Sequence, residues 1–461
     1  FQNNLMGAAA AAASAGGAGF YTHQIANSCR FDGAGKFLRT NGSAPTLATK
    51  YTFSTWVKRS KLGAWMCLIA SETDNVNYDD FVFNSSNYLY QTSQRTTTYE
   101  TYDLSVYRDT SAYYHVVFQW DTTLASATDR MKVYVNGVRL AWDQTTYSGA
   151  IPQDTALKLN QNGASLSVGY SVSNARIFNG YMAQTAGIDG SIVAIGDLGE
   201  TKNGVWIAKD LSGLTFGNNG FLLNYASSGD MGNDVSGNNN DFTPTSVSAH
   251  DQMLDSPTFG SEGSANFPAF SPLYYTQSTN ITEGNLDFVS TGNIEGGLTN
   301  AVIPAGEATV YYFEWCVTVS GGGHEVYIGV NGLNIDMSGS SERGGRDEAT
   351  CWAFLTQPSG YQYVQAGSFD GRSEVSLTIS TGDVVGMVID RANTTIKWYI
   401  NNSLKVTSTN LIATGDLAVW SGKGGGTTNV GGILNAGQDS SFAGQKTAGG
   451  NADSNGFGDF F

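Results

Sequence analysis

The sequence predicts an all-β protein built from two antiparallel β-sandwiches that an irregular connector joins. Two stretches carry the prediction, because each reads as a strand that ends at an aspartate, a polar turn, and a returning strand that ends in Asn-Gly or Asn-Asn. The first spans 115–121 and 131–137, and the second spans 383–390 and 395–402. A glycine count of 57, with 12% aromatic and 14% charged residues, also favours short strands and turns over helices.

Alternating side chains support both hairpins. In each hairpin, large apolar side chains recur at every second position, and successive residues of a strand point to opposite faces. These residues are Val116, Phe118 and Trp120 in the first hairpin and Ile396, Trp398 and Ile400 in the second. One face of each hairpin is therefore expected to build a core, and the other is left for solvent or a ligand.

Length and charge exclude some partners. A chain of 461 residues suits two domains better than one core. A formal charge of -16 argues against a nucleic-acid partner, because phosphate binding needs a basic surface. An acidic surface instead suits neutral ligands or cations. The chain has no apolar run of about 18 residues, so we expect no membrane insertion.

Residues 1–27 are expected to form an Ala/Gly-rich N-terminal arm. The segment contains the alanine run 8–13, but it lacks the basic start and the strongly apolar residues of a signal peptide. We interpret it as a flexible arm, or as one that another protein of the assembly orders. The four cysteines lack the spacing of a zinc site or a disulfide framework, and we expect them to be buried. They are Cys29, Cys67, Cys316 and Cys351.

The first sandwich is expected at 28–195. Strand candidates separated by turn residues are typical of a sandwich. They lie at 51–58, 66–70, 80–83, 165–168 and 177–183. The ordered motifs Phe31-Asp-Gly33, Phe53-Ser-Thr-Trp-Val57, Tyr114-His-Val-Val117, Val133-Tyr-Val-Asn-Gly137, Ser167-Val-Gly169 and Phe178-Asn-Gly-Tyr181 resemble the laminin-G-like, concanavalin-type jelly rolls. This resemblance implies the fold but selects no function, because the fold hosts lectins, glycosidases, adhesion modules and scaffolds.

The second sandwich is expected at 273–445, after an Asn/Gly-rich connector at 196–272 and before a C-terminal tail at 446–461. The connector holds isolated aromatic residues, so we expect it to add a strand or two to its neighbours. The motif order Tyr312-Phe-Glu-Trp315, Tyr327-Ile-Gly-Val330, Gly382-Asp-Val-Val-Gly386 and Ile396-Lys-Trp-Tyr-Ile-Asn-Asn402 resembles SPRY domains. That family implies a bent β-sandwich that binds partners through loops and performs no chemistry.

The whole combination resembles the tail-fibre-like structural proteins of marine bacteriophages. The resemblance rests on the two domains in this order, the connector motifs 239–244 and 255–258, and the closing motifs 442–444 and 456–460. It implies a location on the virion, as part of a tail or head fibre, and thus an extracellular setting. It also implies a homo-oligomer, for which a trimer is our first expectation, and an arm that docks on other virion proteins.

No catalytic set stands out in the sequence. The Glu-x-Asp-x-x-Glu arrangement of the glucanases, in which two carboxylates share a strand face, is absent. Glu314 stands alone on its strand, and we interpret it as a solvated face residue. His115 falls in a half-buried strand, and a structurally satisfied histidine is favoured there over a general base. We therefore expect no enzyme and no cofactor.

Calcium is a minor hypothesis, since Asp and Asn oxygens are its usual ligands. The densest group of such side chains is Asp230, Asp234, Asn238 and Asp241, followed by Asp74, Asn75, Asp79 and Asp80. Neither group has the spacing of a calcium loop. Turn formation by Asn and Asp explains both without a metal.

Ligand contact is expected from aromatic side chains on loops, because sugars stack on such rings while polar groups fix their orientation. The candidates are Tyr99, Tyr102, Tyr107, Trp142 and Tyr147 in the first domain, and Tyr361, Tyr363, Arg343 and Arg346 in the second. Packing between domains or subunits is the competing interpretation for each ring.

Our hypothesis from the sequence is a non-enzymatic virion fibre subunit that adheres to a host surface glycan. Two alternatives remain open. One is a head-decoration protein without a receptor role, fastened to the capsid by its arm. The other is a secreted carbohydrate-binding or polysaccharide-degrading protein.

Overall fold

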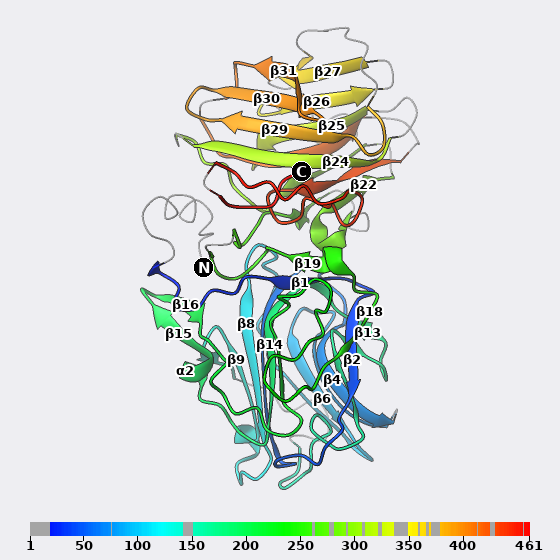
Figure 1. Ribbon diagram of the computed structural model, residues 1–461, viewed down its shortest axis with the longest axis vertical. Helices are drawn as coiled ribbons and strands as arrows, with labels where there is room; N and C mark the ends of the chain where they lie inside the picture. The colour runs from blue at the N-terminus through cyan, green and yellow to red at the C-terminus, as the bar shows by residue number, and fades with distance from the viewer. Residues whose placement is uncertain are drawn as a thin grey trace. The chain divides into compact units, whose positions relative to one another are not determined.

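The computed structural model describes residues 19–461, except 75, 142–150, 261–262, 276–280, 292–293, 307–308, 321–324, 336–348, 358–359, 366–367, 370–378, 413, 425–428 and 455. The described residues form two compact units that divide between Asn266 and Phe267 (Figure 1). We call them the N-terminal unit and the C-terminal unit. Residues 196–266, which the sequence suggested as part of a connector, belong to the N-terminal unit.

The N-terminal unit contains two antiparallel sheets. The first sheet runs in the order β10 (Val138–Arg139), β9 (Met131–Val135), β8 (Tyr114–Asp121), β3 (Lys50–Arg59), β14 (Asn179–Asp189), β1 (Ser28–Asp32) and β19 (Gln252–Met253), and β17 (Phe221–Leu223) also pairs with β14. The second sheet runs in the order β18 (Thr243–Thr245), β2 (Lys36–Thr40), β11 (Ser165–Val168), β4 (Met66–Asp74), β5 (Asn77–Phe83), β6 (Leu89–Gln94) and β7 (Thr98–Tyr102).

Short elements connect these strands. They are the hairpins β12 (Tyr170–Ser171) with β13 (Arg176–Ile177) and β15 (Gly199–Lys202) with β16 (Val205–Ala208), the helix α2 (Ile195–Leu198), and the 3-10 turns η2 (Ala127–Asp129) and η3 (Ala249–Asp251).

The core of the N-terminal unit lies between its two sheets. Phe53 and Phe118 of the first sheet and Leu68 and Phe81 of the second belong to one buried cluster. The rings of Phe81 and Phe118 lie 4.4 Å apart between centroids. Apolar residues at every second position of β3, β8 and β9 face this core, as their alternation predicted.

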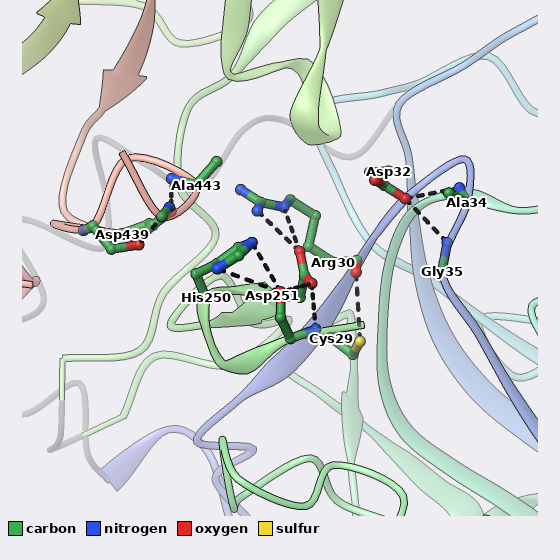
Figure 2. Close-up of polar contacts among 12 residues, drawn as sticks. Cys29, Arg30, Asp32, Ala34, Gly35, His250, Asp251, Asp439 and Ala443 are labelled. Carbon is green, nitrogen blue, oxygen red and sulfur yellow. Dashed lines mark hydrogen bonds and ion pairs between the residues drawn. The ribbon is translucent and has the colours of Figure 1, made fainter. Parts of the chain in front are cut away.

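Residues 196–266 pack on the N-terminal unit. Leu198, Leu211 and Phe216 form a buried cluster with residues of β8 and β14, so they cover the side of the first sheet that faces away from the core. Two buried ion pairs fix the later part of this segment. Lys58 Nζ lies 2.5 Å from Asp255 Oδ2, and Arg30 Nη2 lies 2.9 Å from Asp251 Oδ1 (Figure 2).

The C-terminal unit is a second antiparallel sandwich. One sheet runs in the order β20 (Phe270–Tyr275), β23 (Ile294–Thr299), β32 (Leu417–Gly424), β25 (Glu325–Gly332), β26 (Trp352–Gln357), β27 (Gly360–Gln365) and β28 (Ser368–Phe369). The other runs in the order β21 (Ile281–Thr282), β22 (Asp287–Ser290), β33 (Val430–Asn435), β24 (Val310–Val319), β29 (Val384–Asp390), β30 (Thr395–Ile400) and β31 (Ser403–Ser408), with the turn η5 (Glu283–Asn285). Trp315, Trp398 and Phe354 lie in the core between them.

The last residues of the chain pack on the C-terminal unit (red in Figure 1). Glu314 of β24 was expected to be a solvated face residue, but it is buried because the end of the chain covers it. Its Oε2 accepts hydrogen bonds from Asn435 Nδ2 at 2.9 Å and from the Phe461 amide at 3.1 Å. The ring of Phe460 lies 5.2 Å from that of Tyr312. The end of the tail thus covers β24 on the side away from the core.

The all-β fold class and both predicted hairpins are confirmed. The first hairpin is β8 with β9, and the second is β29 with β30. Asn136 and Gly137 have φ angles of 49° and 78°, and Asn401 and Asn402 have 47° and 65°. These left-handed conformations form two-residue turns to β10 and β31, which is why Asn and Gly stand there. All four cysteines are free and buried, as expected.

Candidate functional site

A row of aromatic side chains lies on the second sheet of the N-terminal unit, on the side away from the core. Tyr90 of β6 is the register partner of Tyr102 in β7 and of Val82 in β5. The neighbouring residue Leu89 points into the core, so Tyr90 and its partners point outward. Strand pairing therefore places side chains from separate strands next to one another on the outer face.

The rings form a continuous row of four. The ring of Tyr102 lies 5.7 Å from that of Tyr90 and 6.3 Å from that of Tyr88, with interplanar angles of 12° and 9°. Trp65 contacts Tyr90 edge to face at 5.2 Å. Trp65 is 37% exposed. We call Trp65, Tyr88, Tyr90 and Tyr102 the aromatic row.

Charged groups flank the aromatic row. The Tyr90 hydroxyl donates to Glu100 Oε2, which lies two residues before Tyr102 on β7. The Arg176 guanidinium lies 4.0 Å from the centre of the Trp65 ring, a cation–π contact. Arg176 Nη1 also lies 3.0 Å from Asp80 Oδ2. Tyr90 itself is 8% exposed, so a ligand would reach the row at the Trp65 ring and at the half-buried rings of Tyr88 and Tyr102.

The β12–β13 hairpin lies against the same face through polar contacts. Ser173 donates to Glu72 Oε2 with its amide, at 3.0 Å, and with its hydroxyl. Asn174 Nδ2 donates to Asp80 Oδ2 at 3.2 Å. Two carboxylates of the sheet thus hold this hairpin beside Trp65.

Asp80 is an unusual acid within this group. Its exposed fraction is 1%, and burial raises the pKa of its carboxyl to about 6 although Arg176 acts in the opposite direction. Its register partner in β6 is Thr92, which is also 1% exposed. A side-chain hydrogen bond from Thr92 also acts on the Asp80 carboxyl and lowers its pKa.

The structure places the sequence-predicted ligand residues in different surroundings. Tyr102 belongs to the aromatic row, whereas Tyr99 is half-buried on the opposite face of β7. Trp142, Tyr147, Arg343 and Arg346 lie outside the described residues. Tyr361 and Tyr363 belong to β27, but their side chains lie outside the described part.

Tyr107 lies in the core and not at the surface. Its exposed fraction is 7%, and its hydroxyl donates to Asp103 Oδ2 at 2.7 Å. The ring contacts Tyr114 at 5.5 Å and Phe83 at 6.1 Å. The Tyr107 ring is therefore used in packing.

The other members of the aromatic row were missed by sequence reasoning. Trp65 precedes β4 directly, and Tyr88 and Tyr90 flank the core residue Leu89. The alternation of Tyr88, Leu89 and Tyr90 is the one local signal that could have indicated a strand with aromatic residues on its outer face.

The expected calcium residues form a hydrogen-bonded loop. Asp234 Oδ1 accepts from the amides of Leu222 and Ser236, and Oδ2 accepts from Ser236 Oγ and the Asn240 amide. Asp241 Oδ1 accepts from the Asp234 amide at 2.8 Å. Asn238 Nδ2 donates to backbone carbonyls, and Asp230 is exposed. In the described part of the chain, no three His, Cys, Asp or Glu side chains are placed to hold a metal ion.

His115 is a buried, neutral side chain. It stacks on Trp56, with centroids 4.6 Å apart, and on Trp206 at 6.0 Å. Trp206 Nε1 donates to His115 Nδ1 at 2.9 Å, so the ring proton is on Nε2, which lies 2.9 Å from Ser54 Oγ. Burial lowers the pKa of His115 to about 3. Both ring nitrogens of His115 have hydrogen-bond partners within the protein, which indicates a structural role.

A pocket of about 400 Å³ lies at the end of the first sheet of the N-terminal unit. Lys50 and Asp121 of its lining form an ion pair at 3.2 Å. Gln119 Nε2 donates to the Val193 carbonyl at 2.5 Å, and Asp129 pairs with Arg139 at 2.7 Å. No aromatic side chain of the described residues lines this pocket, so it is a weaker candidate for sugar contact than the aromatic row.

Residues 32–189 match the family model of the concanavalin A-like lectin/glucanases superfamily. The matched segment contains strands β4 to β7 and the whole aromatic row. It shows that the first sandwich has the concanavalin-like fold that its motifs implied. A comparison with curated proteins gave no match.

Solved structures show weaker likenesses. The SPRY domain of human HERC1 is 17% identical, with a TM-score of 0.27 over 36% of this chain and 95% of that one. A putative carbohydrate binding protein from Bacteroides ovatus is 14% identical, with a TM-score of 0.34 over 49% of this chain and 60% of that one. Domains LG4-5 of the mouse laminin alpha1 chain are 9% identical, with a TM-score of 0.32 over 86% and 83%. These values are too low for a functional conclusion.

Among the residues described, no helix combines the length and the apolar character that crossing a membrane requires.

Proposed function

We propose that this protein is a non-enzymatic glycan-binding protein and that the aromatic row is its contact surface. The observation that carries the proposal is the row itself, in which Trp65 is 37% exposed, the Arg176 guanidinium lies over its ring, and Glu100 accepts from the Tyr90 hydroxyl. The C–H faces of a sugar pack on aromatic rings, and its hydroxyls bind charged groups at the rim. The lectin-type family match over 32–189 supports the same proposal.

A binding measurement with a matched control tests the proposal. Purified protein is titrated calorimetrically with neutral gluco-, manno- and galacto-hexasaccharides. Replacing Trp65 by alanine removes the most exposed ring and is expected to weaken binding roughly tenfold. The control is Tyr274→Ala, because Tyr274 is 49% exposed but lies in the C-terminal unit. Equal loss in both variants, or no binding by the wild type, would contradict the proposal.

We further propose that the protein works on a virion, as a homo-oligomeric fibre subunit that adheres to a host surface glycan, with a trimer as the first expectation. The motif order of the chain motivates this setting. Electron cryo-microscopy of intact particles tests it: projecting density with rotational symmetry supports a fibre. Density flat on the capsid would favour a decoration protein, and absence from particles would favour a secreted one.

A further inference from the structure

Lys58 brings a buried amine into contact with a carboxylate and a carboxamide. Its side chain lies on the face of the first sheet that points away from the core, because the neighbouring residue Val57 belongs to that core. Lys58 Nζ lies 2.5 Å from Asp255 Oδ2 and donates to Asn266 Oδ1 at 2.9 Å. Lys58 and Asp255 are 1% and 0% exposed. The fold thus gathers an amine, an acid–base group and a carbonyl carbon from distant parts of the chain.

Backbone hydrogen bonds fix Asp255 and Asn266 side by side. Asp255 forms a parallel bridge with Ala265, the residue before Asn266. The Ser256 amide donates to the Ala265 carbonyl at 2.7 Å, and the Ala265 amide donates to the Leu254 carbonyl at 3.1 Å. Both side chains therefore reach Lys58 from a hydrogen-bonded backbone.

The Asn266 amide has a defined orientation. Its Nδ2 donates to the Ser111 carbonyl at 2.6 Å, so its Oδ1 is the atom that faces Lys58. A carbonyl bond is about 1.2 Å long, so Lys58 Nζ lies within about 4.1 Å of the carbonyl carbon Cγ. A reactive approach needs about 3–3.5 Å, which a small rotation of the lysine side chain supplies. Asn266 is half-buried, so its Nδ2 can leave toward solvent.

Aromatic side chains surround the amine. The rings of Tyr113 and Tyr181 lie 5.8 and 5.3 Å from Lys58 Nζ, and both belong to a buried cluster with Trp56. Burial disfavours two charges, so a proton can pass from the Lys58 ammonium to Asp255 and leave a neutral amine beside a neutral acid. The amine then has the lone pair that nucleophilic attack requires.

We propose that Lys58 and Asn266 become joined by an isopeptide bond, with Asp255 as the acid–base catalyst. Asp255 takes one proton from the ammonium, and Nζ attacks Asn266 Cγ to give a tetrahedral intermediate. A second Nζ proton passes through Asp255 to Nδ2, the bond between Cγ and Nδ2 breaks, and ammonia leaves. The last proton stays on the new amide, and Asp255 keeps the first one. The reaction takes place once in each chain and turns over no substrate.

The bond ties the end of the N-terminal unit to its central strand. Asn266 is the last residue of that unit, and Lys58 belongs to β3, which pairs with β8 and β14 in the first sheet. A pull that enters the unit from residue 267 therefore acts directly on β3. It cannot extend the 208 positions that separate the linked residues. This inference goes beyond glycan binding, and neither depends on the other.

Mass spectrometry of the full chain tests the bond. The wild type is expected to be lighter than its sequence by one ammonia. Digestion with trypsin and chymotrypsin should give the segment 57–59 joined to 260–267, without cleavage after Lys58. A loss of one water, with Lys58 joined to Asp255, would overturn the assignment of Asn266. An unchanged mass with cleavage after Lys58 would overturn the bond itself.

Three substitutions separate the chemistry from folding. Asn266→Ala removes the carbonyl carbon that is attacked, and Asp255→Asn removes the proton acceptor, so both variants should keep their full mass. Asp251→Asn is the control, because it breaks the other buried ion pair of this segment, with Arg30, and leaves the three reacting groups in place. It should still lose ammonia. If Asp251→Asn also keeps its full mass, or if Asp255→Asn loses ammonia, the catalytic role of Asp255 is wrong.

Force spectroscopy measures the consequence of the bond. When the full chain is pulled from its two ends, the wild type should reach a final length about 70 nm shorter than Asn266→Ala, because 208 positions of about 3.4 Å each stay closed. Equal final lengths would overturn the bond. Sugar titrations of the same preparations are read separately, so a chain that binds sugar but keeps its full mass contradicts this inference and leaves the proposed function standing.

Discussion

Asn136 closes the first hairpin onto His115 through two hydrogen bonds. Asn136 Oδ1 accepts from the His115 amide at 2.8 Å, and the Asn136 amide donates to the His115 carbonyl at 2.9 Å. Asn401 makes the same pair of bonds with Val384, at 3.0 and 2.9 Å. Both asparagines have left-handed backbones. The two sandwiches therefore end their central hairpins with the same side-chain contact.

Replacing Asn136 by alanine should lower the free energy of unfolding of the N-terminal unit by about 2 kcal/mol. The substitution removes one hydrogen bond and places a β-carbon in a left-handed turn. Asn136→Gly keeps the backbone freedom and should cost only about 1 kcal/mol. Urea unfolding of both variants measures the difference. Equal losses would show that the turn conformation contributes nothing.

His115 makes the N-terminal unit sensitive to acid. Its pKa is lowered to about 3 in the fold, so the folded state stays neutral while the unfolded chain takes up a proton below pH 6.5. The free energy of unfolding should fall by up to about 1.4 kcal/mol for each pH unit below 6.5.

The variant His115→Phe isolates this effect. Phenylalanine keeps the stack on Trp56 but leaves Trp206 Nε1 without its acceptor, which costs about 1–3 kcal/mol at pH 7. The stability difference from the wild type should shrink between pH 6.5 and 4.5, as urea unfolding can measure. A stability difference that stays constant with pH would show that the pKa of His115 is not lowered in the folded state.

The buried ion pair of Lys58 and Asp255 is sensitive to the loss of one partner. Lys58→Met leaves the Asp255 carboxylate buried without the ammonium group and should destabilise the N-terminal unit by about 3–5 kcal/mol. The double variant Lys58→Met/Asp255→Leu should recover part of that loss, because it leaves no unpaired charge. Thermal unfolding of the single and double variants gives the comparison. A double variant less stable than the single one would oppose this account.

Glu314 should hold the end of the C-terminal tail. Burial raises the pKa of its carboxyl, and the side chain accepts from Asn435 and Phe461. Glu314→Leu leaves both donors unpaired, so limited proteolysis should cleave residues 446–461 faster. Tyr312→Phe is the control, since it removes one hydroxyl bond to Glu314 and keeps the ring beside Phe460. If the tail of the Glu314→Leu variant is cleaved at the same rate as in the wild type, Glu314 does not hold the tail.

The two hairpins were predictable because their signals are local. Alternation places Val116, Phe118 and Trp120 on one face, and Asn136 with Gly137 marks the end of β9 and its turn to β10. The aromatic row was only partly predictable. Tyr102 was among the expected ligand residues, but Trp65 and Tyr90 join it only through strand pairing, which spacing along the chain does not reveal.

Long-range contacts explain what sequence reasoning missed in residues 196–266. Their composition of Asn, Gly and Asp is typical of a connector, yet Asp251 and Asp255 are partners of charged residues in β1 and β3. An aspartate in a turn and an aspartate in a buried ion pair look alike in sequence. Tyr107 was also mispredicted from the sequence alone. It lies in a loop, and nothing in the neighbouring residues indicates that its ring packs in the core.

The ion pair of Arg30 with Asp251 joins residues that are 221 positions apart, and the contact of Lys58 with Asp255 spans 197. During synthesis on a ribosome, Arg30 of β1 and Lys58 of β3 can therefore form these ion pairs only after Asp251 and Asp255 have emerged, when the N-terminal unit is almost complete. At about 5–20 residues per second, that interval lasts roughly 10–45 s. Through this interval Arg30 and Lys58 lack the carboxylates that neutralise them in the folded unit, so we expect the nascent sandwich to close late.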